Sequence, residues 1–168
     1  ELDFLVHSLA YADTQDLSKP FSETLRDGFN KAMEISAYSL LPLAKGVIPM
    51  MRKRGGGSIV SMSFIGSTLA VPNYNVMGPA KAALESCTRY LARELGPENI
   101  RINSLSPGAI RTLSSAGIKD ISEMIRVAGE HSAMKRTATQ AEVANAAAFL
   151  LSDAASGITG QLIYVDCG

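Results

Sequence analysis

The sequence predicts an α/β fold with a doubly wound parallel sheet. Three observations support this class. Short apolar runs alternate along the chain with longer segments of helical periodicity. The apolar runs are nearly continuous, which is typical of strands covered on both faces of a parallel sheet. The 168 residues contain no internal repeat and no linker-like tract, which indicates a single domain.

The first half of the chain contains two predicted strands and a long helical segment. Residues 2–8 (LDFLVHS) form the first strand, and a polar segment follows it. Apolar residues three and four positions apart predict helical structure over residues 23–54. Residues 58–63 (SIVSMS) then form the second strand.

Two kinds of residue should interrupt or end the long helical segment. Pro42 and Pro49 are expected to bend it or to end parts of it. Arg52, Lys53 and Arg54 suit the negative end of a helix dipole, and Gly55 can take the left-handed capping conformation.

The second half of the chain repeats the alternation of strand and helix. The last helix should begin with a capping box, because Glu142 follows Thr139 by three residues. The expected elements are a helix over residues 74–95, a strand over 100–105, helices near 120–130 and 140–152, and a strand over 161–165.

Composition excludes several functional classes. Sixteen acidic and sixteen basic residues give no net charge, so we expect no nucleic-acid partner. No apolar run reaches a membrane-spanning length. Cys87 and Cys167 are expected to be reduced thiols, and His7 and His131 lack partners at metal-ligand spacing, so no metal is expected.

Candidate site residues lie where the predicted strands end. In open parallel sheets, ligands bind beyond the carboxyl ends of the strands, which here are residues 7–10, 61–64 and 106–112. The loop after the second strand leads to Tyr74 and Lys81, which lie seven residues apart and therefore on one helix face. Spacing alone, however, is explained more simply by an ordinary amphipathic helix.

Two residues between this pair place the start of the helix. Gly78 and Pro79 both lower helix stability, and proline is tolerated only in the first turn. The helix should therefore begin near residues 75–78, with Tyr74 at its entrance. A nearby Lys81 ammonium would favour the phenolate of Tyr74, or would stabilise charge on an adjacent oxygen.

The segment PNYNVMGPAKAALES (72–86) resembles the active-site segment of bacterial enoyl-acyl-carrier-protein reductases, divergent members of the short-chain dehydrogenase/reductase family. In that group a Tyr-x6-Lys pair replaces the commoner Tyr-x3-Lys pair, and Met77 stands where the commoner pattern needs tyrosine. The strings LDFLVHSLAYAD, RDGFNKAMEISAYSL, GPENIRINSLSPGAIRTL and YVDCG resemble the same group in the same order, so the resemblance covers residues 1–168.

The resemblance implies a Rossmann-like fold and an NADH-dependent reduction of trans-2-enoyl-acyl-carrier-protein thioesters in bacterial fatty acid biosynthesis, with NADPH as an alternative cofactor. Tyr74 would hydrogen-bond the thioester oxygen and Lys81 the nicotinamide ribose. Phe64, which stands where many members have a second tyrosine, would complete the catalytic group by packing beside the nicotinamide. Ala12 and Met77 would contact substrate, and residues 113–125 would form a mobile lid. The implied cofactor contacts are Leu9, Ala10, Ser63, Lys81, Ile110, Arg111, Thr112, Leu113 and Ser114.

The order Pro107-Gly108-Ala109 departs from the Ala-Gly-Pro that is usual in the group. The chain also begins at Glu1, almost inside a strand, and lacks the glycine-rich turn that receives a pyrophosphate. We therefore expect residues 1–168 to be the C-terminal two-thirds of one short-chain reductase domain, inactive by itself.

The resemblance further implies a cytoplasmic homotetramer, with subunits packed through the helices over 23–54 and 74–95. Lys119 and Arg126 could meet an acidic carrier protein, or could be ordinary solvated charges. Two other functions remain open: a short-chain reductase acting on another carbonyl or enone, and a non-catalytic family member that serves as a binding protein.

Overall fold

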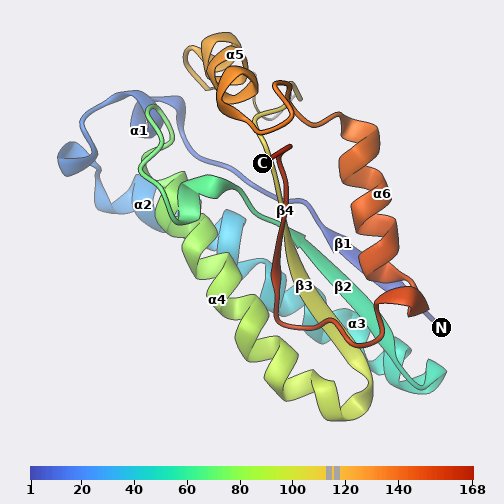
Figure 1. Ribbon diagram of the computed structural model, residues 1–168. Helices are drawn as coiled ribbons and strands as arrows, with labels where there is room; N and C mark the ends of the chain where they lie inside the picture. The colour runs from blue at the N-terminus through green and yellow to red at the C-terminus, as the bar shows by residue number, and fades with distance from the viewer. Residues whose placement is uncertain (113–114, 116–117) are drawn as a thin grey trace.

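The computed structural model describes residues 1–112, 115 and 118–168. Its centre is a four-stranded sheet in the order β1-β2-β3-β4, and all three pairings are parallel. This confirms the predicted α/β class (Figure 1). The strands are β1 (Phe4–His7), β2 (Gly57–Met62), β3 (Ile100–Pro107) and β4 (Leu162–Val165).

Helices connect the strands, as the alternating sequence pattern predicts. Thr139 and Glu142 form the expected capping box at the start of α6. The helices are α1 (Thr14–Ser18), α2 (Arg26–Met33), α3 (Leu40–Arg54), α4 (Met77–Leu95), α5 (Ile121–His131) and α6 (Gln140–Leu151), with a π-helical turn η2 (Glu34–Tyr38) and short 3-10 turns η1 (Phe21–Glu23), η3 (Ile65–Ser67), η4 (Gly96–Glu98) and η6 (Asp153–Ala155).

Helices pack on both faces of the sheet, so the core has two halves. On one face, Ile59 and Ile102 pack against side chains of α3 and α4. On the other face, Val60 and Leu105 pack against side chains of α6. Neighbouring residues of β2 thus enter opposite halves of the core, which follows from the alternation of side chains along a strand.

Strand β1 differs from its prediction. The apolar run predicted a strand covered on both faces, but Phe4 and Val6 are 53% and 44% exposed. These two side chains line an open apolar groove beside α6, whereas His7 points to the other face and is fully buried. The prediction was wrong for one face because α6 covers β2 there and leaves β1 open.

The long helical segment is divided earlier than the prolines suggested. The break is the π-helical turn at Glu34–Tyr38; Pro42 lies in the first turn of α3, and Pro49 lies inside α3 without ending it. The Ser36 hydroxyl in the π turn accepts a hydrogen bond from Tyr11 N (2.9 Å) and donates to Tyr11 O (3.1 Å). This contact joins the π turn to the segment after β1, and the sequence could not show it.

The end of α3 agrees better with expectation. Gly55 caps α3 in the left-handed conformation (φ 86°), as predicted. In the described part of the chain, both cysteines are free and no three His, Cys, Asp or Glu side chains gather as a metal site. No described helix combines the length and the apolar character that a membrane crossing requires.

Candidate active site

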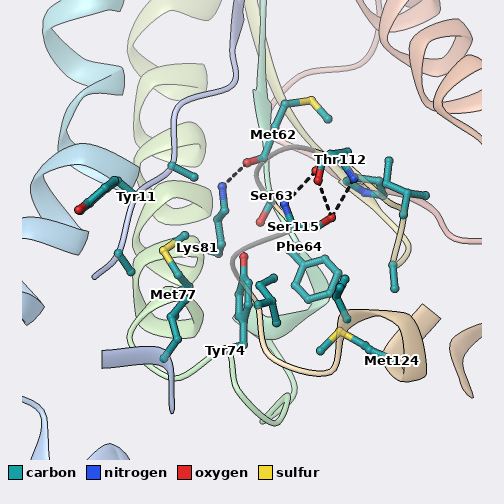
Figure 2. Close-up of a pocket in the computed structure, with 18 of the residues that line it drawn as sticks. Tyr11, Met62, Ser63, Phe64, Tyr74, Met77, Lys81, Thr112, Ser115 and Met124 are labelled. Carbon is teal, nitrogen blue, oxygen red and sulfur yellow. Dashed lines mark hydrogen bonds between the residues drawn. The ribbon is translucent and has the colours of Figure 1, made fainter. Parts of the chain in front are cut away.

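A cavity of about 470 Å³ opens at the carboxyl ends of β1, β2 and β3. Because these parallel strands end at the same edge of the sheet, three loops converge there with the start of α4 (Figure 2). The segments after β1 and β2, the first turns of α4, the segment after β3 and the beginning of α5 all contribute side chains.

Lys81 reaches the cavity from the second turn of α4. Its side chain is buried (5% exposed), and Nζ donates a hydrogen bond to the Met62 carbonyl at 2.7 Å (Figure 2). Burial lowers the pKa of Lys81 to about 8, although the Glu85 carboxylate works in the opposite direction. An ammonium has three N–H donors, so two remain available to a ligand in the cavity.

Tyr74 lies in the turn that enters α4, as the sequence predicts. Its ring is buried against Phe64, with ring centroids 4.8 Å apart and planes tilted by 58°. In the described residues the Tyr74 hydroxyl has no hydrogen-bond partner, and Figure 2 shows it directed into the cavity toward the side where Lys81 lies.

Burial, and not Lys81, sets the protonation of the Tyr74 phenol. Burial raises the pKa of Tyr74 well above its usual range of about 10, and no opposing effect of the lysine is resolved. The ammonium is engaged with the Met62 carbonyl, and desolvation of the phenolate outweighs any attraction. Tyr74 is therefore a neutral hydrogen-bond donor.

Two glycines explain how the Tyr74 ring fits. A Cβ at Gly66 would lie 2.5 Å from the Tyr74 ring, and a Cβ at Gly78 would lie 2.8 Å from the Gly66 carbonyl oxygen. The backbone of the loop after β2 therefore lies in close contact with both the Tyr74 ring and the first turn of α4. Gly78, which is unfavourable in a plain helix, is required by this close approach. Helix α4 begins at Met77 with Pro79 in its first turn, which confirms the predicted start.

Most of the predicted site residues lie together in the cavity wall. Leu9 and Arg111 are not among the lining residues: Leu9 is exposed, and the Arg111 guanidinium donates to Ser122 Oγ. The residues that do line the cavity are Ala10, Ala12, Ser63, Phe64, Tyr74, Met77, Lys81, Ile110 and Thr112.

Part of the predicted lid lies outside the described residues, namely Leu113, Ser114, Ala116 and Gly117. Of the described remainder, Ser115 closes a small loop with Thr112: Thr112 N donates to Ser115 Oγ (2.8 Å), and Ser115 N donates to Thr112 Oγ1 (3.0 Å). Ile118, Ile121 and Met124 line the cavity.

Sequence reasoning missed several lining residues. Met62 contributes its carbonyl, and no sequence signal identifies a backbone ligand. The other missed residues are Tyr11, Thr14 and Leu17, which lie outside the predicted strand ends and the predicted lid.

Comparison with known proteins decides the family. The sequence profile described as "Enoyl-(Acyl carrier protein) reductase" matches residues 1–168, the whole chain. The chain belongs to this family. It is 53% identical over 167 residues to the enoyl-[acyl-carrier-protein] reductase [NADH] FabI of Nostoc sp. and 52% identical over 168 residues to the Synechocystis sp. protein of the same name.

These alignments cover 99% and 100% of this chain but 64% of each relative. The crystal structure of FabI from Candidatus Liberibacter asiaticus superposes with a TM-score of 0.95 at 42% identity, covering 99% of this chain and 64% of that one. The chain thus spans slightly less than two-thirds of the relatives' length.

The cavity lining fits one end of a nicotinamide dinucleotide. Lys81 offers two free N–H donors beside hydroxyl groups of Ser63 and Thr112, and donors and acceptors of this kind suit ribose and carboxamide groups. Phe64 supplies a flat apolar surface in the same wall.

Proposed function

We propose that the full-length protein reduces trans-2-enoyl-acyl-carrier-protein thioesters with NADH, in bacterial fatty acid biosynthesis. The observation that carries the proposal is the placement of Tyr74 and Lys81 in one cavity, with Met77 where a Tyr-x3-Lys reductase needs its tyrosine. The names of the relatives, which specify this reaction with NADH, support it.

Lys81, Phe64 and Tyr74 would each have a separate role in the reaction. NADH, when bound, would supply the hydride. Lys81 would hold the nicotinamide ribose with its two remaining donors, and Phe64 would pack beside the nicotinamide. Tyr74 Oη would donate a hydrogen bond to the thioester carbonyl oxygen, on which negative charge develops. Because burial raises the pKa of Tyr74, its proton stays on the hydroxyl at neutral pH.

The apolar residues would hold the acyl chain. Met77, Leu17, Ile118, Ile121 and Met124 line one continuous cavity with Tyr74. Burial of an acyl chain there would contribute about 0.8 kcal/mol per methylene group. Closure of the lining would also keep water from the reacting atoms.

The decisive experiment measures NADH oxidation by the full-length protein with crotonyl and acetoacetyl thioesters. The proposal expects turnover with the enoyl substrate and little with the ketone. Preference for acetoacetyl thioester would instead support a reductase of another carbonyl, and turnover of neither would support a non-catalytic role. NADPH in place of NADH should give a lower kcat/KM.

Assembly and location extend the proposal. We infer a cytoplasmic homotetramer that receives its substrate on acyl-carrier protein. Large apolar side chains are exposed on the helices expected to pack between subunits, including Tyr38, Leu43, Met50 and Tyr90. Light scattering on the purified full-length protein should give four times the subunit mass, and a monomer would contradict the inference.

A further inference from the structure

Helix α4 buries a second charged side chain one turn beyond Lys81. Glu85 is 6% exposed, and its Oε1 accepts a hydrogen bond from Ser63 Oγ at 2.5 Å. Residues four apart lie on the same helix face, so Lys81 and Glu85 both face the end of β2. They bind consecutive residues there, since Lys81 donates to the Met62 carbonyl.

A third side chain continues this row of contacts away from the cavity. Thr88, fully buried on the next turn of α4, lies 3.0 Å from Ser61 Oγ and accepts a hydrogen bond from Ser104 Oγ at 3.0 Å. Three successive turns of α4 are therefore joined to the end of β2 by polar contacts. This row fixes the helix relative to the strand end.

A buried carboxylate is costly unless it has partners. The described structure gives Glu85 one hydrogen bond, from Ser63. Lys81 and the exposed Arg89 each stand four residues from Glu85 along α4, and neither forms an ion pair with it among the described residues. The Ser63 hydroxyl donates its only hydrogen to Glu85, so Ser63 Oγ can form further hydrogen bonds only as an acceptor.

We propose, resting on the function proposed above, that Glu85 is a positioning residue for the cofactor site. It orients Ser63 as an acceptor for a donor group of the nicotinamide dinucleotide, and its charge keeps the Lys81 ammonium protonated. Glu85 touches neither substrate nor cofactor in this role; it acts through Ser63 and Lys81.

The charges around Lys81 give the direction of the effect. Burial lowers the pKa of Lys81 to about 8, and the negative charge of Glu85 raises it. His7, buried at the end of β1, has its pKa lowered by burial and by Lys81, and the Tyr74 phenol remains neutral. Among these described groups Glu85 is the anion that supports the ammonium, so its removal should make Lys81 lose its proton at lower pH.

The test compares Glu85→Gln with the wild type in the full-length protein. NADH binding is measured by the fluorescence of NADH between pH 6 and 9, together with kcat/KM for crotonyl thioester. We expect the alkaline loss of NADH affinity to move down by about half a pH unit or more and affinity at pH 8 to fall about twofold or more. Near pH 6 the two proteins should converge.

Three further variants separate the effects. Glu94→Gln, the same change at an exposed position of α4, should leave both profiles unchanged. Ser63→Ala keeps the charge of Glu85, so it should weaken NADH binding at every pH without moving the alkaline limb. Glu85→Asp keeps the charge but shortens the side chain. Its NADH affinity should therefore be lost at the same alkaline pH as in the wild type, although the affinity itself should be lower.

The outcomes are distinguishable. An unchanged alkaline limb in Glu85→Gln, with a melting temperature near that of the wild type, overturns the proposal. If Glu85→Gln does not fold, Glu85→Asp decides the question. A loss of NADH affinity at lower pH in Glu85→Asp than in the wild type would overturn the proposal, because this variant keeps the charge. A wild-type protein that binds NADH but does not reduce crotonyl thioester refutes the proposed function alone, because the binding profiles still decide the role of Glu85.

Discussion

Replacement of Tyr74 by phenylalanine tests the central chemistry with little disturbance of the fold. The substitution removes one hydroxyl, which has no protein partner in the described residues, and keeps the ring that packs against Phe64 and over Gly66. The free energy of unfolding should therefore change by no more than about 0.5 kcal/mol.

The effect on catalysis should be much larger. Loss of one donor to a developing oxyanion costs about 10²–10³ in kcat, equivalent to about 2.7–4 kcal/mol. Tyr74 is buried, and Phe64 beside it has no hydroxyl to take over the donation. We therefore expect the upper part of this range for kcat with crotonyl thioester. NADH affinity should remain the same because Lys81 is intact.

The assay is stopped-flow and steady-state oxidation of NADH by the full-length protein. Tyr90→Phe is the matched control, since Tyr90 lies on the same helix and is 77% exposed; its kinetics should equal those of the wild type. Tyr74→Phe with full turnover would refute the reasoning and favour a role for Tyr74 in packing alone.

Three other predictions concern packing and stability. Gly66→Ala should displace the Tyr74 ring, because the new Cβ would lie 2.5 Å from it, and should lower kcat at least about tenfold while costing about 1–3 kcal/mol of stability. Arg101→Met should cost about 3 kcal/mol in urea unfolding, since the guanidinium donates to the Leu150 carbonyl in the last turn of α6 and to the Ser152 and Ile158 carbonyls after it. Glu142→Gln should be less stable than the wild type at neutral pH. Arg136 and the Thr139 cap lower the pKa of Glu142 from its ordinary value of 4.5 to about 2, so in thermal melts its contribution is complete above about pH 5 and disappears toward pH 2.

The site could be located from the sequence because its residues are tied to local signals. Tyr74 stands at a helix entrance that Pro79 determines, and Ser63 and Ile110 follow strands whose ends must meet in a parallel sheet. The π-helical turn at Glu34–Tyr38 had no such signal, and its Ser36 hydroxyl makes hydrogen bonds with the backbone of Tyr11 that no local pattern indicates. A contact between residues 25 positions apart does not change the pattern of apolar residues in either segment, so the sequence pattern cannot reveal it.

The sequence by itself determined the alternation of strands and helices, the start of α4, the caps of α3 and α6, and the position of Tyr74 and Lys81 at the start of α4. Each of these depends on residues within one or two turns of one another. Only the tertiary structure decided that Tyr74 is a neutral donor, that Lys81 donates to Met62, and that Glu85 is buried against Ser63. Protonation and hydrogen-bond direction depend on desolvation and on partners from other elements, and these exist only when the strand ends and the helix come together.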